Sequence, residues 1–78
     1  MRPFIGYSHE LRIRNARTAT DLDSLVDDLL AHCGMQGLAP GESYADAAWR
    51  MMTVSPDAAR AALAAATRIY EITLDNAP

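Results

Sequence analysis

The chain has 78 residues, of which half are apolar, and a formal net charge of −3. This length and composition indicate one small globular domain, residues 1–78, rather than a disordered chain. Much of the apolar content is alanine, and so thin a core is often stabilised by association with a second copy or another protein. A lone cysteine, no recognisable signal peptide and no long apolar run exclude an intrachain disulfide and a membrane span, so we expect a cytoplasmic protein.

Charge is uneven along the chain. Residues 1–20 carry a net charge of +3, whereas residues 21–46 carry six acids and no arginine, a net charge of −6. The remaining residues balance to zero. A basic arm followed by an acidic helix is the main electrostatic feature.

The first nineteen residues are open to two interpretations. "ELRIR" alternates like a short strand and could pair with "IYEITL" near the end of the chain. Alternatively, Ser8 is a suitable N-cap for a helix over 9–17. We favour a helical or irregular arm, because an isolated two-stranded ribbon is only marginally stable.

The segment "TDLDSLVDDLLAHCG" predicts a helix over 21–33. Its apolar residues fall on one helical face. These residues are Leu22, Leu25, Val26, Leu29, Leu30 and Cys33. Thr20 is the expected N-cap, and Gly34 provides the left-handed stop.

Two further helices are predicted after a glycine-rich loop. Ser43 caps a helix over 44–52, and Ser55, with Pro56 at the first helical position, begins a helix over 56–73. The inner face of the first is Tyr44, Ala47, Ala48, Met51 and Met52. The inner face of the second is Ala59, Ala62, Leu63, Ala66, Ile69 and Tyr70. The predicted fold is therefore an all-α, compact three-helix domain with a basic N-terminal arm or a short fourth helix.

The stretch "YADAAWRMMTVSPDAARAAL", residues 44–63, resembles the helix-turn-helix motif of DNA-binding regulators. The resemblance implies a turn through Thr53-Val54-Ser55 and a recognition helix from Pro56. The turn glycine of the motif is missing, and with Thr53 in its place Trp49 stands where the motif has a small residue. The recognition helix offers Asp57 in its first turn and only Arg60 as a nearby base, whereas DNA affinity depends on several basic side chains. This charge favours a protein partner over DNA.

Other chemistry has weaker signals. "LDSL" at 22–25 resembles the attachment site of acyl and peptidyl carrier proteins, which would carry a phosphopantetheine on Ser24, but only 23 residues precede that serine. Two histidines and one cysteine without grouped spacing predict no metal site. His32-Cys33 is interpreted as part of a helix with a buried structural cysteine. We expect no cofactor and no enzymatic activity, because no acid and base are paired for catalysis.

The predicted function is that of a small acidic regulatory protein that binds another protein, such as an antiactivator of a transcription factor or an antitoxin-like inhibitor. The alternatives are a DNA-binding regulator and, after it, a carrier protein. A partner with a basic surface is expected, and a homodimer is an open alternative. Trp49 lies about 140° from Tyr44 on its helix, which leaves an interface role and a core role both open. The candidate partner-binding residues are Asp23, Asp27, Asp28, Trp49, Arg50 and Met52.

Overall fold

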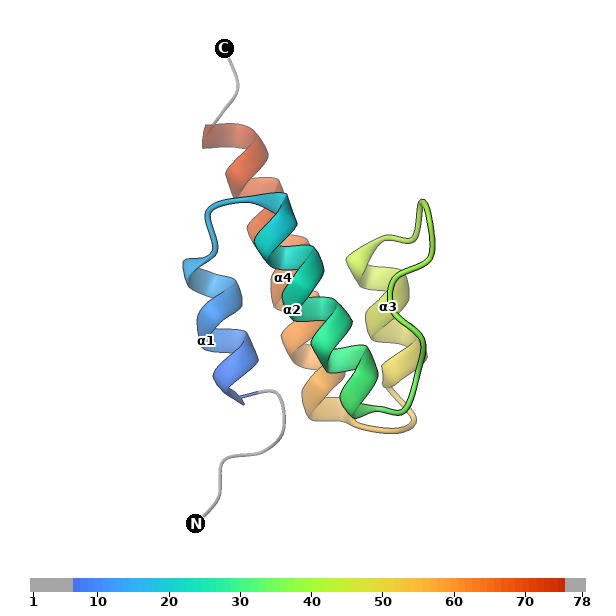
Figure 1. Ribbon diagram of the computed structural model, residues 1–78. Helices are drawn as coiled ribbons and strands as arrows, with labels where there is room; N and C mark the ends of the chain where they lie inside the picture. The colour runs from blue at the N-terminus through green and yellow to red at the C-terminus, as the bar shows by residue number, and fades with distance from the viewer. Residues whose placement is uncertain (1–6, 76–78) are drawn as a thin grey trace.

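The computed structural model describes residues 7–75, which form four α-helices. These are α1 (Tyr7–Asn15), α2 (Ala19–His32), α3 (Tyr44–Met51) and α4 (Pro56–Asp75). The predicted all-α class is confirmed, but the described chain has four helices rather than three, because its N-terminal part forms the short additional helix (Figure 1). "ELRIR" and "IYEITL" both lie in helices, so the strand interpretation is wrong. Residues 1–6 of the predicted arm lie outside the described residues.

Hydroxyl side chains determine where the helices begin. The Thr18 hydroxyl oxygen accepts a hydrogen bond from the backbone N–H of Asp21 at 3.2 Å, so α2 begins at Ala19. The predicted cap at Thr20 is wrong, because the extended backbone of Thr18 already satisfies the first turn. Gly34, with a φ of 73°, follows the end of α2 as predicted.

The two later N-caps are confirmed. Ser43 accepts from the backbone N–H of Asp46 at 3.1 Å, and Ser55 accepts from that of Ala58 at 3.2 Å. Pro56 takes the first position of α4, where its missing N–H costs nothing. The far ends differ slightly, since α3 stops at Met51 and α4 continues to Asp75.

The central helix is α4, which packs against the other three helices (Figure 1). The largest fully buried side chains come from those three helices and are Ile13, Leu22, Val26, Leu29, Leu30 and Met51. The buried residues of α4 are Ala58, Ala59, Ala61, Ala62, Ala65 and Ile72. Because methyl side chains occupy little volume, they allow neighbouring helices to approach α4 closely.

The inward faces of the first two predicted helices are largely confirmed, and that of the third is confirmed in part, since Ala59 and Ala62 are buried and Ile69 packs against the core. Leu22, Val26, Leu29, Leu30, Ala47, Ala48 and Met51 are buried as expected. In α4, however, Leu63 is 44% exposed and Tyr70 is 66% exposed. Larger side chains do not fit between closely packed helices, so α4 turns its alanines inward and these two residues outward.

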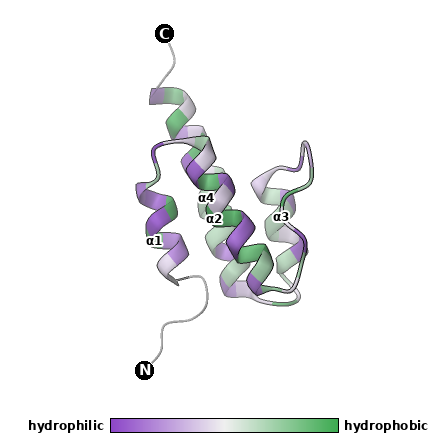
Figure 2. Cartoon of the chain, viewed as in Figure 1, coloured by the Kyte–Doolittle hydropathy of each residue, from purple (hydrophilic) through white to green (hydrophobic). Residues whose placement is uncertain are grey.

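The helix α1 is mostly hydrophilic (Figure 2) and makes few apolar contacts. Ile13 is fully buried, and Arg68 Nε donates a hydrogen bond to the Ala16 carbonyl oxygen at 2.8 Å. Glu10 forms an ion pair with Arg14 at 3.0 Å within α1 and another with Arg60 of α4 at 3.5 Å. None of the described helices is long and apolar enough to cross a membrane.

We predict unequal effects of two neighbouring substitutions in α4. Ala62→Leu adds volume at a fully buried contact and should lower the free energy of unfolding by roughly 1–3 kcal/mol. Leu63→Ala removes a largely solvated side chain and should lower it by less than about 1 kcal/mol. Urea denaturation followed by circular dichroism measures both values. Equal losses would show that Leu63 faces the core after all.

Candidate protein-binding surface

Two of the predicted partner-binding acids, Asp23 and Asp27, connect α2 to α3 and to the loop between them. Asp23 Oδ1 accepts a hydrogen bond from the Tyr44 hydroxyl of α3, and Asp27 Oδ1 accepts one from the backbone N–H of Leu38 at 2.8 Å. Burial, followed by the Asp23 hydrogen bond, raises the pKa of Tyr44, so this hydroxyl remains a protonated donor. Both residues are exposed, but each carboxylate already accepts a hydrogen bond from within the chain.

The position of Asp27 also explains the glycine at position 37. A Cβ atom on Gly37 would lie 2.8 Å from Asp27 Oδ1, the same atom that accepts the hydrogen bond from Leu38. A larger residue would force the Asp27 carboxylate to shift from this position. The close approach fixes the course of the loop between α2 and α3.

Asp28 keeps its charge exposed, with 65% of its side chain accessible to solvent. Its neighbour is the His9 ring of α1, with 3.9 Å between Asp28 Oδ2 and His9 Nε2. His9 packs edge-on against His32, with ring centroids 5.5 Å apart. Burial, and then the nearby His32, lower the pKa of His9, although Asp28 opposes the shift. His9 is therefore neutral at pH 7 and does not neutralise Asp28.

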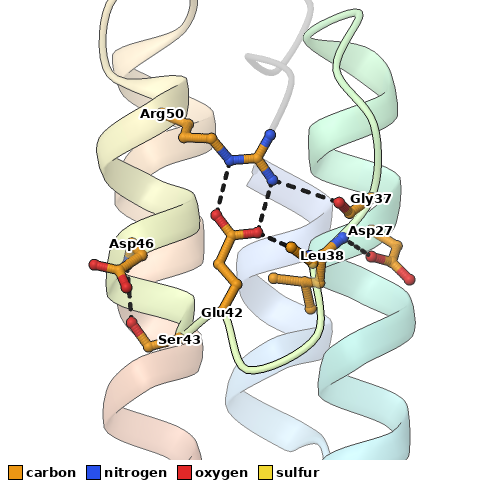
Figure 3. A network of polar contacts seen from close by, with 8 residues as sticks. Asp27, Gly37, Leu38, Glu42, Ser43, Asp46 and Arg50 are labelled. Atoms are coloured by element: carbon orange, nitrogen blue, oxygen red, sulfur yellow. Dashed lines mark hydrogen bonds and ion pairs between the residues drawn. The ribbon is translucent and has the colours of Figure 1, made fainter.

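Arg50, another predicted partner-binding residue, clamps the loop that precedes α3 (Figure 3). Its Nε and Nη2 atoms each donate to one oxygen of Glu42 at 2.8 Å, and Nη2 lies 3.5 Å from the Gly37 carbonyl oxygen. Glu42 Oε1 also accepts from the backbone N–H of Ala39 at 3.0 Å. These hydrogen bonds, the one from Arg50 foremost, lower the pKa of Glu42. The guanidinium is thus already used within the chain.

Trp49 and Met52 remain available, and with Val54 they form what we call the Trp49 surface. These three side chains are 76%, 41% and 55% exposed, so the core role for Trp49 is excluded. Trp49 lies in the last turn of α3, and the turn that follows, with Met52 and Val54, is held by the backbone N–H groups of Val54 and Ser55, which donate to the Met51 carbonyl oxygen at 3.0 and 2.8 Å. The apolar groups are therefore presented by a hydrogen-bonded backbone.

Sequence reasoning missed a second apolar surface, on the outer side of α4. Leu63, Thr67, Tyr70 and Leu74 are all exposed and recur at i, i+4, i+7 and i+11, which places them on one helical face. We call these four residues the α4 row. The signal that marks this face is the alanine spacing, since the buried methyl groups define the inward side and leave these residues outward.

The residues that suggested other chemistry are not brought together. Burial raises the pKa of the half-buried Cys33 thiol, which keeps it protonated and poorly nucleophilic. Ser24 lies exposed in the body of α2. Within residues 7–75, no group of three or more histidine, cysteine or acidic side chains is placed to hold a metal ion.

The Glu42–Arg50 pair predicts a pH dependence of stability. Because the pKa of Glu42 is lowered in the folded chain, the unfolded chain takes up a proton first as the pH falls. The stabilisation is present at neutral pH and is lost below the ordinary pKa of a glutamate. Glu42→Gln should lower the melting temperature at pH 7 and flatten its decline between about pH 5 and pH 3.

Asp75→Asn is the matched control, since Asp75 is an exposed acid at the end of α4. This variant should keep the wild-type acid profile. A Glu42→Gln variant with the same melting temperature as wild type at every pH would contradict a stabilising pair.

Comparison with known proteins leaves both surfaces unassigned. No family model, no curated protein and no solved structure matches the chain. What these surfaces bind is therefore inferred from their own side chains.

Proposed function

We propose that this chain is a small acidic regulatory protein that acts by binding another protein, such as an antiactivator of a transcription factor or an antitoxin-like inhibitor. The observation that carries the proposal is Trp49, which is 76% exposed and is followed within five residues by the exposed Met52 and Val54. Tryptophan is over-represented among the residues that dominate binding energy, and methionine adapts its shape to a partner. A surface on a hydrogen-bonded turn loses little conformational entropy on binding.

The charge of α2 supports a partner with a basic surface. Asp23 and Asp27 accept hydrogen bonds from a phenol and a backbone N–H, which are neutral donors and leave each carboxylate its full charge. Asp28 adds a third exposed charge on the same helix. Such a field speeds association with a basic partner and selects against acidic ones.

The arrangement of α3 and α4 supports a protein partner over DNA. The two helices lie side by side and run in opposite directions (Figure 1), whereas the helices of a helix-turn-helix cross at roughly 90–120°. The first turns of α4 carry Asp57 and one base, Arg60, which is already paired with Glu10. Neither feature suits contact with phosphates or base edges.

We predict that Trp49→Ala lowers partner affinity at least tenfold, or about 1.4 kcal/mol, because a central tryptophan is a typical binding hot spot. Immobilised wild-type protein should retain a protein from lysate of the native host, and the variant should not. Leu11→Ala is the matched control, since Leu11 is an exposed apolar residue of α1 and is 48% exposed.

The same immobilised protein should retain no duplex DNA in a sequence-specific manner at physiological salt. Circular dichroism should show unchanged helicity for both variants, because both side chains are largely solvated. Sequence-specific DNA binding would promote the DNA-binding alternative. Equal retention of the partner by wild type and Trp49→Ala would exclude the Trp49 surface as the contact.

A further inference from the structure

The distribution of side-chain sizes on α4 is reversed relative to an ordinary amphipathic helix. Its buried face is alanine apart from Ile72, whereas its outer face carries Leu63, Tyr70 and Leu74, which are 44%, 66% and 56% exposed. With Thr67 between them, these residues extend over roughly 16 Å of helix at 1.5 Å per residue. The exposed fractions show that no described segment covers this row.

The shape of the molecule places the α4 row on a broad face. The chain measures 41 × 31 × 15 Å along its principal axes, so the molecule is flat. In Figure 1, α2 lies in front of α4, with α1 and α3 on either side. The side of α4 that faces away from α2 therefore belongs to a broad face of the molecule, which is open to face-to-face stacking.

We propose that the α4 row binds a second copy of this chain, in a two-fold symmetric dimer whose α4 helices run antiparallel. The charges beside the row favour this occupant. Arg60 and Glu71 are eleven residues apart, close to three helical turns, so they lie along the same border of the row. In an antiparallel two-fold pair centred near residues 65 and 66, Arg60 of each copy lies opposite Glu71 of the other. A parallel two-fold pair would instead place the charged borders of the two copies on opposite edges of the interface.

The contacts that these residues make within one copy are compatible with the pairing. Arg60 lies 3.5 Å from Glu10, and Glu71 lies 3.5 Å from Arg68. A guanidinium has five N–H donors and can hold a second carboxylate beside the first. Arg60, Leu63 and Thr67 also line a groove between α4 and α1, together with Glu10 and Arg14 of α1.

This dimer goes beyond the proposed function and does not depend on it. The α4 row is on the fourth helix, and the Trp49 surface is at the end of the third and in the following turn. Two Trp49 surfaces related by a two-fold axis would then be presented by each dimer. A substitution in the α4 row should leave the Trp49 surface intact, and a substitution in the Trp49 surface should leave the α4 row intact.

Sedimentation velocity over a wide range of protein concentration tests the association. We expect a reversible monomer–dimer equilibrium. Leu63→Asp and Tyr70→Asp should each lower the association constant at least about tenfold, because each buries a charge in the row. Leu11→Asp and Trp49→Ala should leave the constant unchanged. Circular dichroism identifies any variant that fails to fold, and the two substitutions in the row serve as independent tests.

Charge reversal tests the antiparallel arrangement. Arg60→Glu and Glu71→Arg should each weaken the dimer about tenfold, since each places like charges across both symmetric contacts. The double variant should regain an association constant within about threefold of wild type. Its contacts with Glu10 and Arg68 remain unfavourable, so improved monomer stability cannot explain this recovery.

Three results would overturn the proposal. The first is a wild-type protein that stays monomeric at about 1 mM, the Kd of the weakest specific complexes. The second is a dimer unaffected by either substitution in the row. The third is a double variant that associates no better than the single variants, which would exclude the antiparallel pairing.

Discussion

The fold depends on how closely three helices can approach the alanine-rich side of α4. Five buried alanines of this helix replace the larger residues that a central helix usually carries, so α1, α2 and α3 supply the bulk of the core. The same constraint determines the surface, because Leu63 and Tyr70 cannot fit at these contacts and point outward. The compact interior and the exposed apolar row of α4 thus have one cause.

The connection between α2 and α3 depends on polar contacts instead. A carboxylate from α2, Asp27, binds the backbone of Leu38, and the loop residue Glu42 is held by a guanidinium from α3. These contacts hold the loop to α2 and to α3. At Gly37 the loop backbone comes so close to the Asp27 carboxylate that a Cβ atom would crowd it. Asp27, a candidate residue for binding a basic partner, therefore also orders the loop. The same carboxylate contributes both to the stability of the loop and to the negative charge of α2.

The sequence predicts those elements whose signals are local. The large apolar residues from Leu22 to Leu30 repeat with helical period, and Ser43 and Ser55 are followed by clear helical stretches, so these features are as expected. The inward face of α4 is only partly as predicted: Ala59 and Ala62 are buried, but Leu63 and Tyr70 are exposed, because large apolar residues ordinarily mark a core face and here the alanines form it. The roles of Asp27 and Arg50 depend on partners 11 and 8 residues away across a loop, which no periodicity indicates.

The sparse attachment of α1 has a consequence for the dynamics of the chain. This helix is attached by the fully buried Ile13, the Glu10–Arg60 ion pair and the edge-on contact of His9 with His32, and the residue after it, Ala16, accepts the hydrogen bond from Arg68. Releasing a single isoleucine side chain to solvent costs about 1.5–3 kcal/mol, well below the roughly 5–15 kcal/mol that global unfolding of a domain requires. The amide hydrogens of α1 are therefore expected to exchange with water through a local opening. Those at the centre of α2 and α4 should exchange only when the whole domain unfolds. We therefore expect the N-terminal helix to open as a unit separate from α2 and α4.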